Sequence, residues 1–280
     1  ARTAADVGFA GLGLPQICAN AALTALAVIG REVDGIELGT GVVPTYPRHP
    51  MMLAAQALTT NAAVGGRFTL GIGLSHQIVV ESMLGYSYDK PARHMREYLS
   101  ILVPLIREGS VSFAGETLTF HGTVGVPGST PCPVLVAALG PMMLELTGSM
   151  ADGTVTWMTG PATVADHIGP SIRRAAAGAG RPDPRIVSAL PVLVTDDPDE
   201  ARQRAATTFS IYGDLPAYRA MLDREGVAGP ADVAVVGDEA TVAAGIARMA
   251  DAGATDFLAV EFGITDGERT RTRDLLRTLL

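Results

Sequence analysis

Gly140, Pro141 and Met142 are the residues of this chain whose types and spacing best fit a binding role. They follow an apolar run, Pro133–Leu139, that predicts a buried strand, and they precede residues with helical spacing. Proline suits the first helical turn because its missing N–H would be unpaired there anyway, and Gly140 lets a ligand approach the backbone closely. Since a helix start presents free N–H groups and a positive dipole, this turn predicts a phosphate site, with an ordinary strand-to-helix turn as the alternative.

A near-copy of this turn occurs at Gly153–Pro161, where a strand again runs into Gly-Pro and a helix. Two such turns on successive strands predict one ligand held between neighbouring loops. Trp157 lies within this second segment, either as a core residue or as the aromatic wall of a pocket.

The other predicted strand ends carry few groups that could do chemistry: no lysine, no cluster of metal ligands and no paired carboxylates. Lyases, aldolases and metal-dependent hydrolases need such groups, so an apolar, glycine-rich mouth favours a cofactor that brings its own reactivity. His76 directly follows the predicted strand Gly66–Leu74 and is the best acid–base candidate, because histidine titrates near neutral pH; a structural histidine is the alternative. Gly71 and Gly73 begin a dinucleotide-binding motif that lacks its third glycine, so close packing is the better interpretation.

The composition limits the possible partners. The chain has 280 residues, is 48% hydrophobic and carries a net charge of −8, which argues against nucleic acid and anionic membranes. No apolar run reaches membrane-spanning length. Cys18 and Cys132 have no metal or redox spacing, which indicates a reducing cytoplasm. Lys90 is the only lysine, a bias typical of high-GC bacteria such as actinobacteria, so it is also the only candidate for a Schiff base.

A repeated pattern, in which a helix ends in alanine and glycine and a strand follows at once, predicts βα units and a parallel sheet. The predicted strands are Phe9–Leu14, Gly35–Val43, Gly66–Leu74, Val134–Leu139, Gly153–Met158, Ile186–Thr195 and Thr255–Phe262. The predicted helices are Ala19–Arg31, Pro50–Ala63, Ala92–Arg107, Pro141–Met150, Ala162–Ala179, Pro198–Tyr212, Pro216–Glu225 and Ala240–Ala252.

These elements predict a single domain, residues 1–280, folded as an α/β protein of the (β/α)8 TIM-barrel type. Insertions interrupt the alternation near 75–91, 110–131 and 196–237. The second insertion predicts a β-hairpin and the third predicts two helices. A doubly wound sheet is the alternative architecture.

Four segments together resemble the luciferase-like monooxygenase superfamily, and within it the branch of oxidoreductases that use the deazaflavin coenzyme F420. The segments are Ile36–Pro50, Gly66–His76, Val136–Pro141 and Ala151–Gly153. Their order and spacing, which continue to Ala252–Phe257, are more specific than any one segment alone.

The resemblance implies a strand-end bulge with a non-prolyl cis peptide bond at Gly41–Val42, backing the deazaflavin ring. It assigns coenzyme contacts to three groups of residues. The bulge and the loop after it contribute Gly41, Val42, Val43 and Thr45; the ring is flanked by Leu74, Ser75 and His76; the phosphate is held by Ala138, Leu139, Gly140, Pro141 and Met142. The assignment of the phosphate to these residues agrees with the prediction made above from the helix start at Gly140. Trp157 is expected to help shape the pocket.

Two departures from the family matter. Its sugar-phosphate dehydrogenases use an Asp-His pair after the second strand and a Glu after the fourth, whereas Gln16 and His76 stand near those positions here. Sugar-phosphate oxidation is therefore not expected. The family also opens with a strand, whereas the given chain starts inside the following helix. Because a barrel without one strand exposes two edges, we expect residues before Ala1, or another segment, to fill a gap between Phe9–Leu14 and Thr255–Phe262.

We therefore expect a cytoplasmic oxidoreductase, acting as a homodimer, that moves hydride between F420 and a small organic substrate. His76 and Gln16 are the candidate catalytic residues: His76 would donate a proton or polarise the substrate, and Gln16 would shape the pocket together with Trp157. An FMN-dependent monooxygenase on the same fold is the first alternative. A non-redox barrel for a phosphorylated ligand, and a barrel that carries the coenzyme without turnover, are the others.

Overall fold

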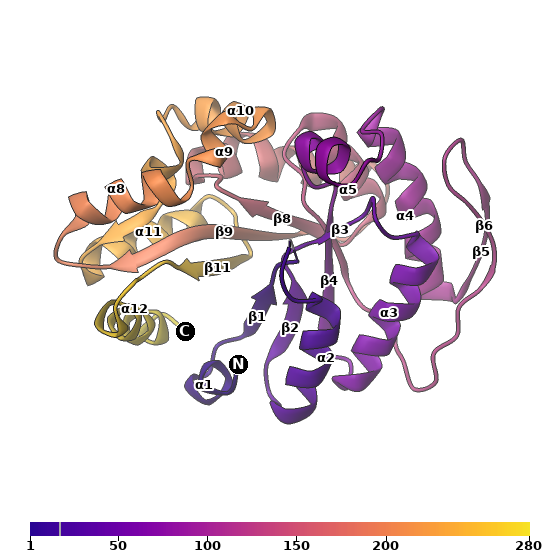
Figure 1. Ribbon diagram of the computed structural model, residues 1–280, viewed down its shortest axis with the longest axis horizontal. Helices are drawn as coiled ribbons and strands as arrows, with labels where there is room; N and C mark the ends of the chain where they lie inside the picture. Colours follow the sequence, from indigo (N-terminus) through magenta and orange to yellow (C-terminus); the bar gives the residue numbers. More distant parts are fainter. Residues whose placement is uncertain (17) are drawn as a thin grey trace.

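Nine strands of the described chain form one parallel sheet that curls towards a barrel (Figure 1). The structure is a computed structural model that describes residues 1–16 and 18–280. Along the sheet the strands run β1 (Gly11–Leu14), β2 (Glu37–Thr40), β4 (Phe68–Gly73), β7 (Val134–Val136), β8 (Gly153–Trp157) and β9 (Arg185–Val194). Both β10 (Val235–Gly237) and β11 (Asp256–Glu261) pair with β9, and the short β3 (Val43–Pro44) pairs with β4.

Helices cover the outside of this sheet (Figure 1). They are α1 (Arg2–Val7), α2 (Ala22–Glu32), α3 (Pro50–Ala63), α4 (Pro91–Glu108), α5 (Pro141–Met150), α6 (Pro161–Thr163), α7 (Gly169–Gly178), α8 (Pro198–Thr208), α9 (Ile211–Asp214), α10 (Pro216–Glu225), α11 (Glu239–Asp251) and α12 (Asp266–Thr278). Proline stands in the first turn of α3, α4 and α5, where its missing N–H leaves no partner unpaired. None of the helices that the structure describes has both the length and the hydropathy needed to cross a membrane.

The barrel prediction is confirmed, and the doubly wound alternative is wrong. The predicted strand Gly35–Val43 is present as β2 and β3, which meet at a cis peptide bond between Gly41 and Val42, as predicted. The predicted β-hairpin insertion is also confirmed: β5 (Ser110–Ala114) and β6 (Thr119–Thr123) pair in antiparallel register after α4.

Several local predictions were wrong. The third insertion contains the strand β10 in addition to helices. This strand was missed because two valines and a glycine are too few residues to show a period. The predicted helix Ala162–Ala179 contains a π-helical turn, Val164–Ile168, between α6 and α7. The predicted helix Pro198–Tyr212 is divided into α8 and α9. The helix α12 was not predicted, since its sequence is mostly charged and it buries only Thr272 and Leu276.

The glycines of β4 serve close strand packing, as their spacing indicated. All six residues of β4 are buried. A Cβ on Gly71 would lie 2.0 Å from the carbonyl oxygen of Thr40, and one on Gly73 would lie 2.9 Å from Cγ2 of Val42. The Thr40 hydroxyl bonds the Gly71 backbone at both its N–H (2.8 Å) and its carbonyl (2.7 Å). These glycines therefore let β2 and the bulge after it lie directly against β4.

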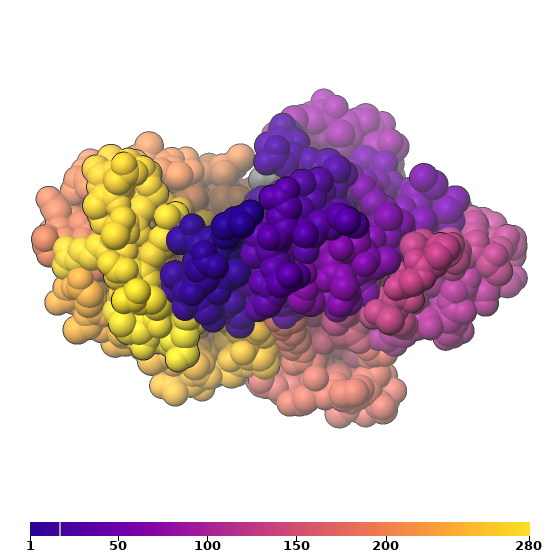
Figure 2. Space-filling model, turned by 90° about the horizontal axis from the view of Figure 1, so that it is seen from below, coloured from indigo at the N-terminus to yellow at the C-terminus, as the bar shows by residue number. Residues whose placement is uncertain are grey.

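The two ends of the sheet, β1 and β11, face one another as predicted. Within the described residues they share no backbone pairing, and apart from the exposed Gly11 their residues are partly buried. The Leu258 side chain of β11 approaches β1, since a Cβ on Gly13 would lie 3.2 Å from Leu258 Cδ2. From below, the yellow C-terminal helix lies beside the indigo N-terminal segment (Figure 2), and Leu280 lies close to Gly8.

An ion-pair network links three strands at the N-terminal end of the barrel, away from the predicted site. Arg185 on β9 donates to both carboxylate oxygens of Glu37 on β2, at 2.7 and 3.1 Å. It also donates to both oxygens of Asp256 on β11, at 2.9 and 2.7 Å. These hydrogen bonds lower the pKa of Asp256 and hold the guanidinium charged. The network therefore joins β2 to β9, which the sheet does not pair, and reinforces the paired strands β9 and β11.

Replacing Arg185 with alanine should lower the free energy of unfolding by about 1–3 kcal/mol. The three side chains are each about one-third exposed, so the effect lies between those of a surface pair and a buried pair. Chemical denaturation measures it. Arg2→Ala is the control, because Arg2 pairs with Glu32 at 3.6 Å and both side chains are about 70% exposed; an equal loss in both variants would contradict a special role for the network.

Candidate active site

The predicted site residues gather at the C-terminal ends of the strands. Because the strands are parallel, the loops after β1, β3, β4, β7 and β8 all leave the same edge of the sheet. The bulge after β2 lies at the centre of this edge: Gly41 N donates to Leu14 O at 3.1 Å, and Val42 O accepts from Gln16 N at 3.2 Å. These bonds hold the bulge against β1, and the pairing of β3 with β4 holds its other side.

Gln16 has a structural contact that sequence reasoning did not foresee. Its side-chain Oε1 accepts a hydrogen bond from Ala22 N at 2.9 Å, at the start of α2. This contact satisfies one of the unpaired N–H groups of the helix start. The side-chain Nε2 of Gln16 takes no part in this contact. A catalytic role for Gln16 therefore stays a prediction.

Thr45 is buried and its hydroxyl lies 3.0 Å from His94 Nε2. The His94 ring stacks on Tyr46 with ring centroids 4.0 Å apart. Burial lowers the pKa of His94 to about 4, so this ring is neutral at physiological pH. The Thr45 side chain is thus engaged within the protein, and its predicted contact with the coenzyme is not tested by the structure.

Leu74, Ser75 and His76 form the start of the loop after β4. Ser75 has a φ of 65°, the left-handed region that residues other than glycine seldom adopt. Its carbonyl oxygen accepts a hydrogen bond of 3.4 Å from the hydroxyl of Tyr88, in the predicted insertion near 75–91. His76 is half-buried, and burial lowers the pKa of its ring below the usual 6.5.

Aromatic side chains from separate parts of the chain surround His76 and Trp157. Ring centroids of His76 lie 5.7 Å from Tyr218 and 6.5 Å from Tyr212, both edge-on. Trp157 contacts Tyr212 at 5.9 Å and Phe209 at 5.7 Å. We call the set the mouth cluster. Its members are His76, Trp157, Phe209, Tyr212, Tyr218 and Phe262.

Sequence reasoning missed the part of the mouth cluster that comes from α9, α10 and the turn before them. The signal was present, since Phe209, Tyr212 and Tyr218 fall within ten residues of a chain that is only 5% aromatic. The sequence left Trp157 as either a core residue or a pocket wall. The structure shows it half-buried and packed against the core, and its role as a pocket wall stays a prediction.

The turn at Gly140 is open to a ligand. A Cβ on Gly140 would meet nothing within 4 Å, and its φ of −78° is one that any residue adopts. Neither packing nor backbone conformation therefore requires glycine here. Among the described residues no side chain caps the N-terminus of α5. Ala138 is buried below the turn, and Leu139 O accepts from His167 Nε2 at 2.8 Å, which fixes the carbonyl side of the turn.

The turn at Gly160 differs, and the prediction that both turns hold one ligand is wrong. The carboxylate of Glu225, at the end of α10, accepts hydrogen bonds from Ala162 N at 3.1 Å and Thr163 N at 2.7 Å. A Cβ on Gly160 would lie 2.4 Å from this carboxylate. A protein carboxylate thus occupies the second helix start and ties α10 to α6.

Replacing Glu225 with alanine should lower the free energy of unfolding by about 0.5–2 kcal/mol, the range for a lost helix cap. It should also loosen α10 and so change the fluorescence of Trp157, which is the only tryptophan. Asp197→Ala is the matched control, because Asp197 caps α8 by accepting from Glu200 N. Equal emission spectra in the Glu225 variant and the wild type would contradict the tie between α10 and the mouth cluster.

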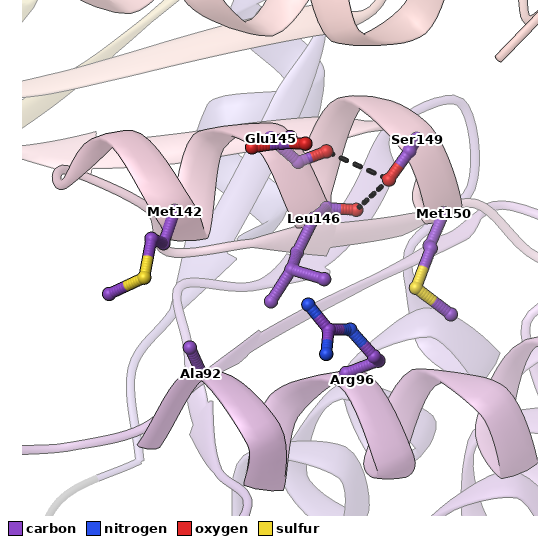
Figure 3. A pocket seen from close by; sticks show the side chains of 7 residues that line it. All are labelled: Ala92, Arg96, Met142, Glu145, Leu146, Ser149 and Met150. Carbon is purple, nitrogen blue, oxygen red and sulfur yellow. Dashed lines mark hydrogen bonds between the residues drawn. The ribbon is translucent and has the colours of Figure 1, made fainter. Parts of the chain in front are cut away.

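A groove of about 290 Å³ lies between α4 and α5, beside the Gly140 turn (Figure 3). Met142, 69% exposed, stands at the end of this groove that is nearest the turn. Figure 3 shows Arg96 reaching from α4 towards α5, where Glu145 and Ser149 also line the groove. The groove is thus lined by a positive side chain, a negative side chain and apolar residues. Within the described residues, no group of three or more metal-ligating side chains could hold a metal ion.

A family model described as luciferase-like monooxygenase matches residues 1–256. The chain therefore belongs to the luciferase-like monooxygenase family. A Mycobacterium tuberculosis protein named as a coenzyme F420-dependent oxidoreductase is 30% identical over 247 residues, covering 82% of this chain and 70% of that protein. A 5,10-methylenetetrahydromethanopterin reductase of Archaeoglobus fulgidus is 31% identical over 217 residues, covering 75% of this chain and 63% of that protein. These relatives support the predicted F420-dependent branch.

Solved structures agree in fold. The coenzyme F420-dependent tetrahydromethanopterin reductase of Methanopyrus kandleri superposes with a TM-score of 0.81 at 21% identity, covering 99% of this chain and 91% of that one. An F420-dependent secondary alcohol dehydrogenase in complex with an F420–acetone adduct gives 0.83 at 16% identity, covering 100% and 92%. At such identities the likeness shows the shared barrel alone.

Proposed function

We propose that this chain is an oxidoreductase that transfers hydride between coenzyme F420 and a small organic substrate at the barrel mouth. The observation that carries the proposal is the uncapped start of α5 at Gly140, where neither packing nor φ needs a glycine. A helix start of this kind suits the phosphate of a coenzyme. The relatives named for F420 chemistry support the choice of coenzyme.

The residues at the mouth fit the coenzyme. When bound, F420 supplies a carrier for two electrons as hydride. The backbone N–H groups at the start of α5 would hold its phosphate, and the Gly41–Val42 bulge would support the ring. His76 would hold or move one proton at its imidazole N–H, since burial lowers its ring pKa and leaves the ring neutral at neutral pH. The mouth cluster would exclude water from the reacting atoms.

Fluorescence of Trp157 tests this proposal directly, because the chain has one tryptophan and it lies in the mouth cluster. Titration of the purified protein with F420 should quench this emission to saturation. The deazaflavin without its phosphate should bind more weakly, since it lacks the group that α5 would hold. N-acetyltryptophanamide in place of the protein corrects for absorbed light.

The same titration with FMN separates the proposal from its first alternative. Saturable binding of F420, with much weaker binding of FMN, supports the proposal. Tighter binding of FMN, together with rapid oxygen consumption by the reduced complex, would instead favour a flavin monooxygenase. Absence of saturable quenching by either compound would contradict both.

A further inference from the structure

The indole nitrogen of Trp157 is a buried donor with no hydrogen-bond partner among the described residues. Buried polar atoms in folded proteins are nearly always paired, so an unpaired one at a candidate site calls for an explanation. Trp157 ends β8, at the same edge of the sheet as His76 and Gly140. Both the Trp157 ring and the His76 ring lie within 6.5 Å of the Tyr212 ring. An unpaired donor and the acid–base candidate thus share one aromatic neighbour.

Three charged side chains on or beside the elements that carry the mouth cluster are engaged elsewhere. The Arg219 guanidinium donates to Asp223 at 2.9 Å and to the backbone carbonyls of Val227 and Ala228. Glu225 caps α6, as described above. Glu261, next to Phe262, accepts from Arg273. Where side chains recognise a phosphate or carboxylate group, they do so through free guanidinium or ammonium groups. The mouth cluster instead offers aromatic surface with isolated neutral donors.

We infer that the substrate is an uncharged, mostly apolar carbonyl compound, or the corresponding alcohol, whose oxygen accepts a hydrogen bond from Trp157 Nε1. This inference rests on the proposed function and specifies its substrate class. It explains the unpaired indole N–H, which the substrate oxygen satisfies on binding. It also explains the aromatic neighbours, which supply apolar contact area to the rest of the substrate.

The chemistry balances in both directions. In reduction, the carbonyl carbon receives a hydride from the reduced coenzyme, the carbon–oxygen π bond breaks, and the oxygen receives one proton from the His76 imidazolium, which becomes the neutral ring. Solvent returns that proton to His76. Negative charge develops on the oxygen before the proton arrives, so the Trp157 N–H stabilises the transition state more than the ground state. Oxidation of the alcohol reverses each step.

A comparison of two probes of the same shape tests the inference without turnover. Acetophenone carries a carbonyl oxygen and ethylbenzene does not, so calorimetry on wild-type protein should show roughly ten-fold tighter binding of acetophenone. Trp157→Phe keeps an aromatic ring but removes the N–H, and should abolish this preference. Tyr98→Phe is the control, because it removes another buried, unpaired donor that lies outside the mouth cluster; it should leave the preference unchanged.

Turnover with two alcohols completes the test. With oxidised F420, 1-phenylethanol should be oxidised and glucose 6-phosphate should not. Equal affinity of wild-type protein for both probes, an undiminished preference in Trp157→Phe, or oxidation of glucose 6-phosphate would overturn the inference. The probe comparison is made with and without F420. Failure of F420 to bind would therefore appear in the Trp157 titration, while the carbonyl preference could still be measured on the coenzyme-free protein.

Discussion

Replacing His76 with alanine should lower kcat by roughly 10²–10⁴-fold, the usual loss when a general acid or base is removed. The reason is its position directly after β4, in edge-on contact with Tyr212 and Tyr218. Within the described residues no hydrogen bond holds either ring nitrogen, so the imidazole is available to a substrate. The coenzyme Kd should change little, because the proposed phosphate site lies on the turn after β7. Single-turnover kinetics with F420 separates these two quantities.

His121→Ala is the matched control, since His121 lies on the β6 hairpin strand and bonds Ser112. The kcat of the His121→Ala variant should equal that of the wild type. Unchanged turnover in His76→Ala would make His76 a bystander, whereas weakened coenzyme binding with unchanged kcat would make it a binding residue.

The pH dependence of kcat tests which form of His76 acts. Burial lowers its pKa below 6.5, so the neutral ring dominates at neutral pH and can accept the proton of an alcohol substrate. In alcohol oxidation we expect kcat to stay level as pH rises above neutrality and to fall as acid protonates the ring. A fall in kcat as pH rises through neutrality would show that the charged ring is required. His76→Ala should lose the acid limb of the profile.

Replacing Gly140 with valine should weaken coenzyme binding by roughly 10²–10⁴-fold. Valine places branched carbons where the phosphate approaches the backbone, and each charge-assisted hydrogen bond lost from α5 is worth about 1.5–3 kcal/mol. The fold should tolerate the change with a stability loss of about 1 kcal/mol, because valine is a poor N-cap residue. A Cβ at this position meets no atom within 4 Å. Titration of Trp157 fluorescence gives the affinity, and thermal unfolding gives the stability.

Gly125→Val controls for the loss of a glycine at an open, unconstrained position. A Cβ on Gly125 also meets nothing within 4 Å, and its φ is not in the left-handed region. It should change neither affinity nor stability. If Gly140→Val unfolds the protein while any folded fraction binds F420 normally, the glycine serves strand–helix packing and the phosphate site lies elsewhere.

Local sequence determined the barrel and the position of its mouth. Glycine-terminated helices followed at once by apolar strands specify parallel βα units, and parallel strands end at one edge by geometry. His76, Gly140 and Trp157 could therefore be assigned to one rim without a structure. The bulge at Gly41–Val42 was predictable in the same way, because the residues that form it are adjacent in the chain.

Only the tertiary structure decided which of the two Gly-Pro turns is open. Glu225 reaches the Gly160 turn from more than sixty residues further along the chain, and no local pattern marks a carboxylate as the cap of a distant helix. The pairing of Arg185 with Glu37 and Asp256, and the contact of Tyr212 and Tyr218 with His76, have the same character. The spacing of apolar residues predicts which side of one helix or strand is buried. These contacts instead join residues that are far apart in the sequence, so they depend on how distant segments pack together.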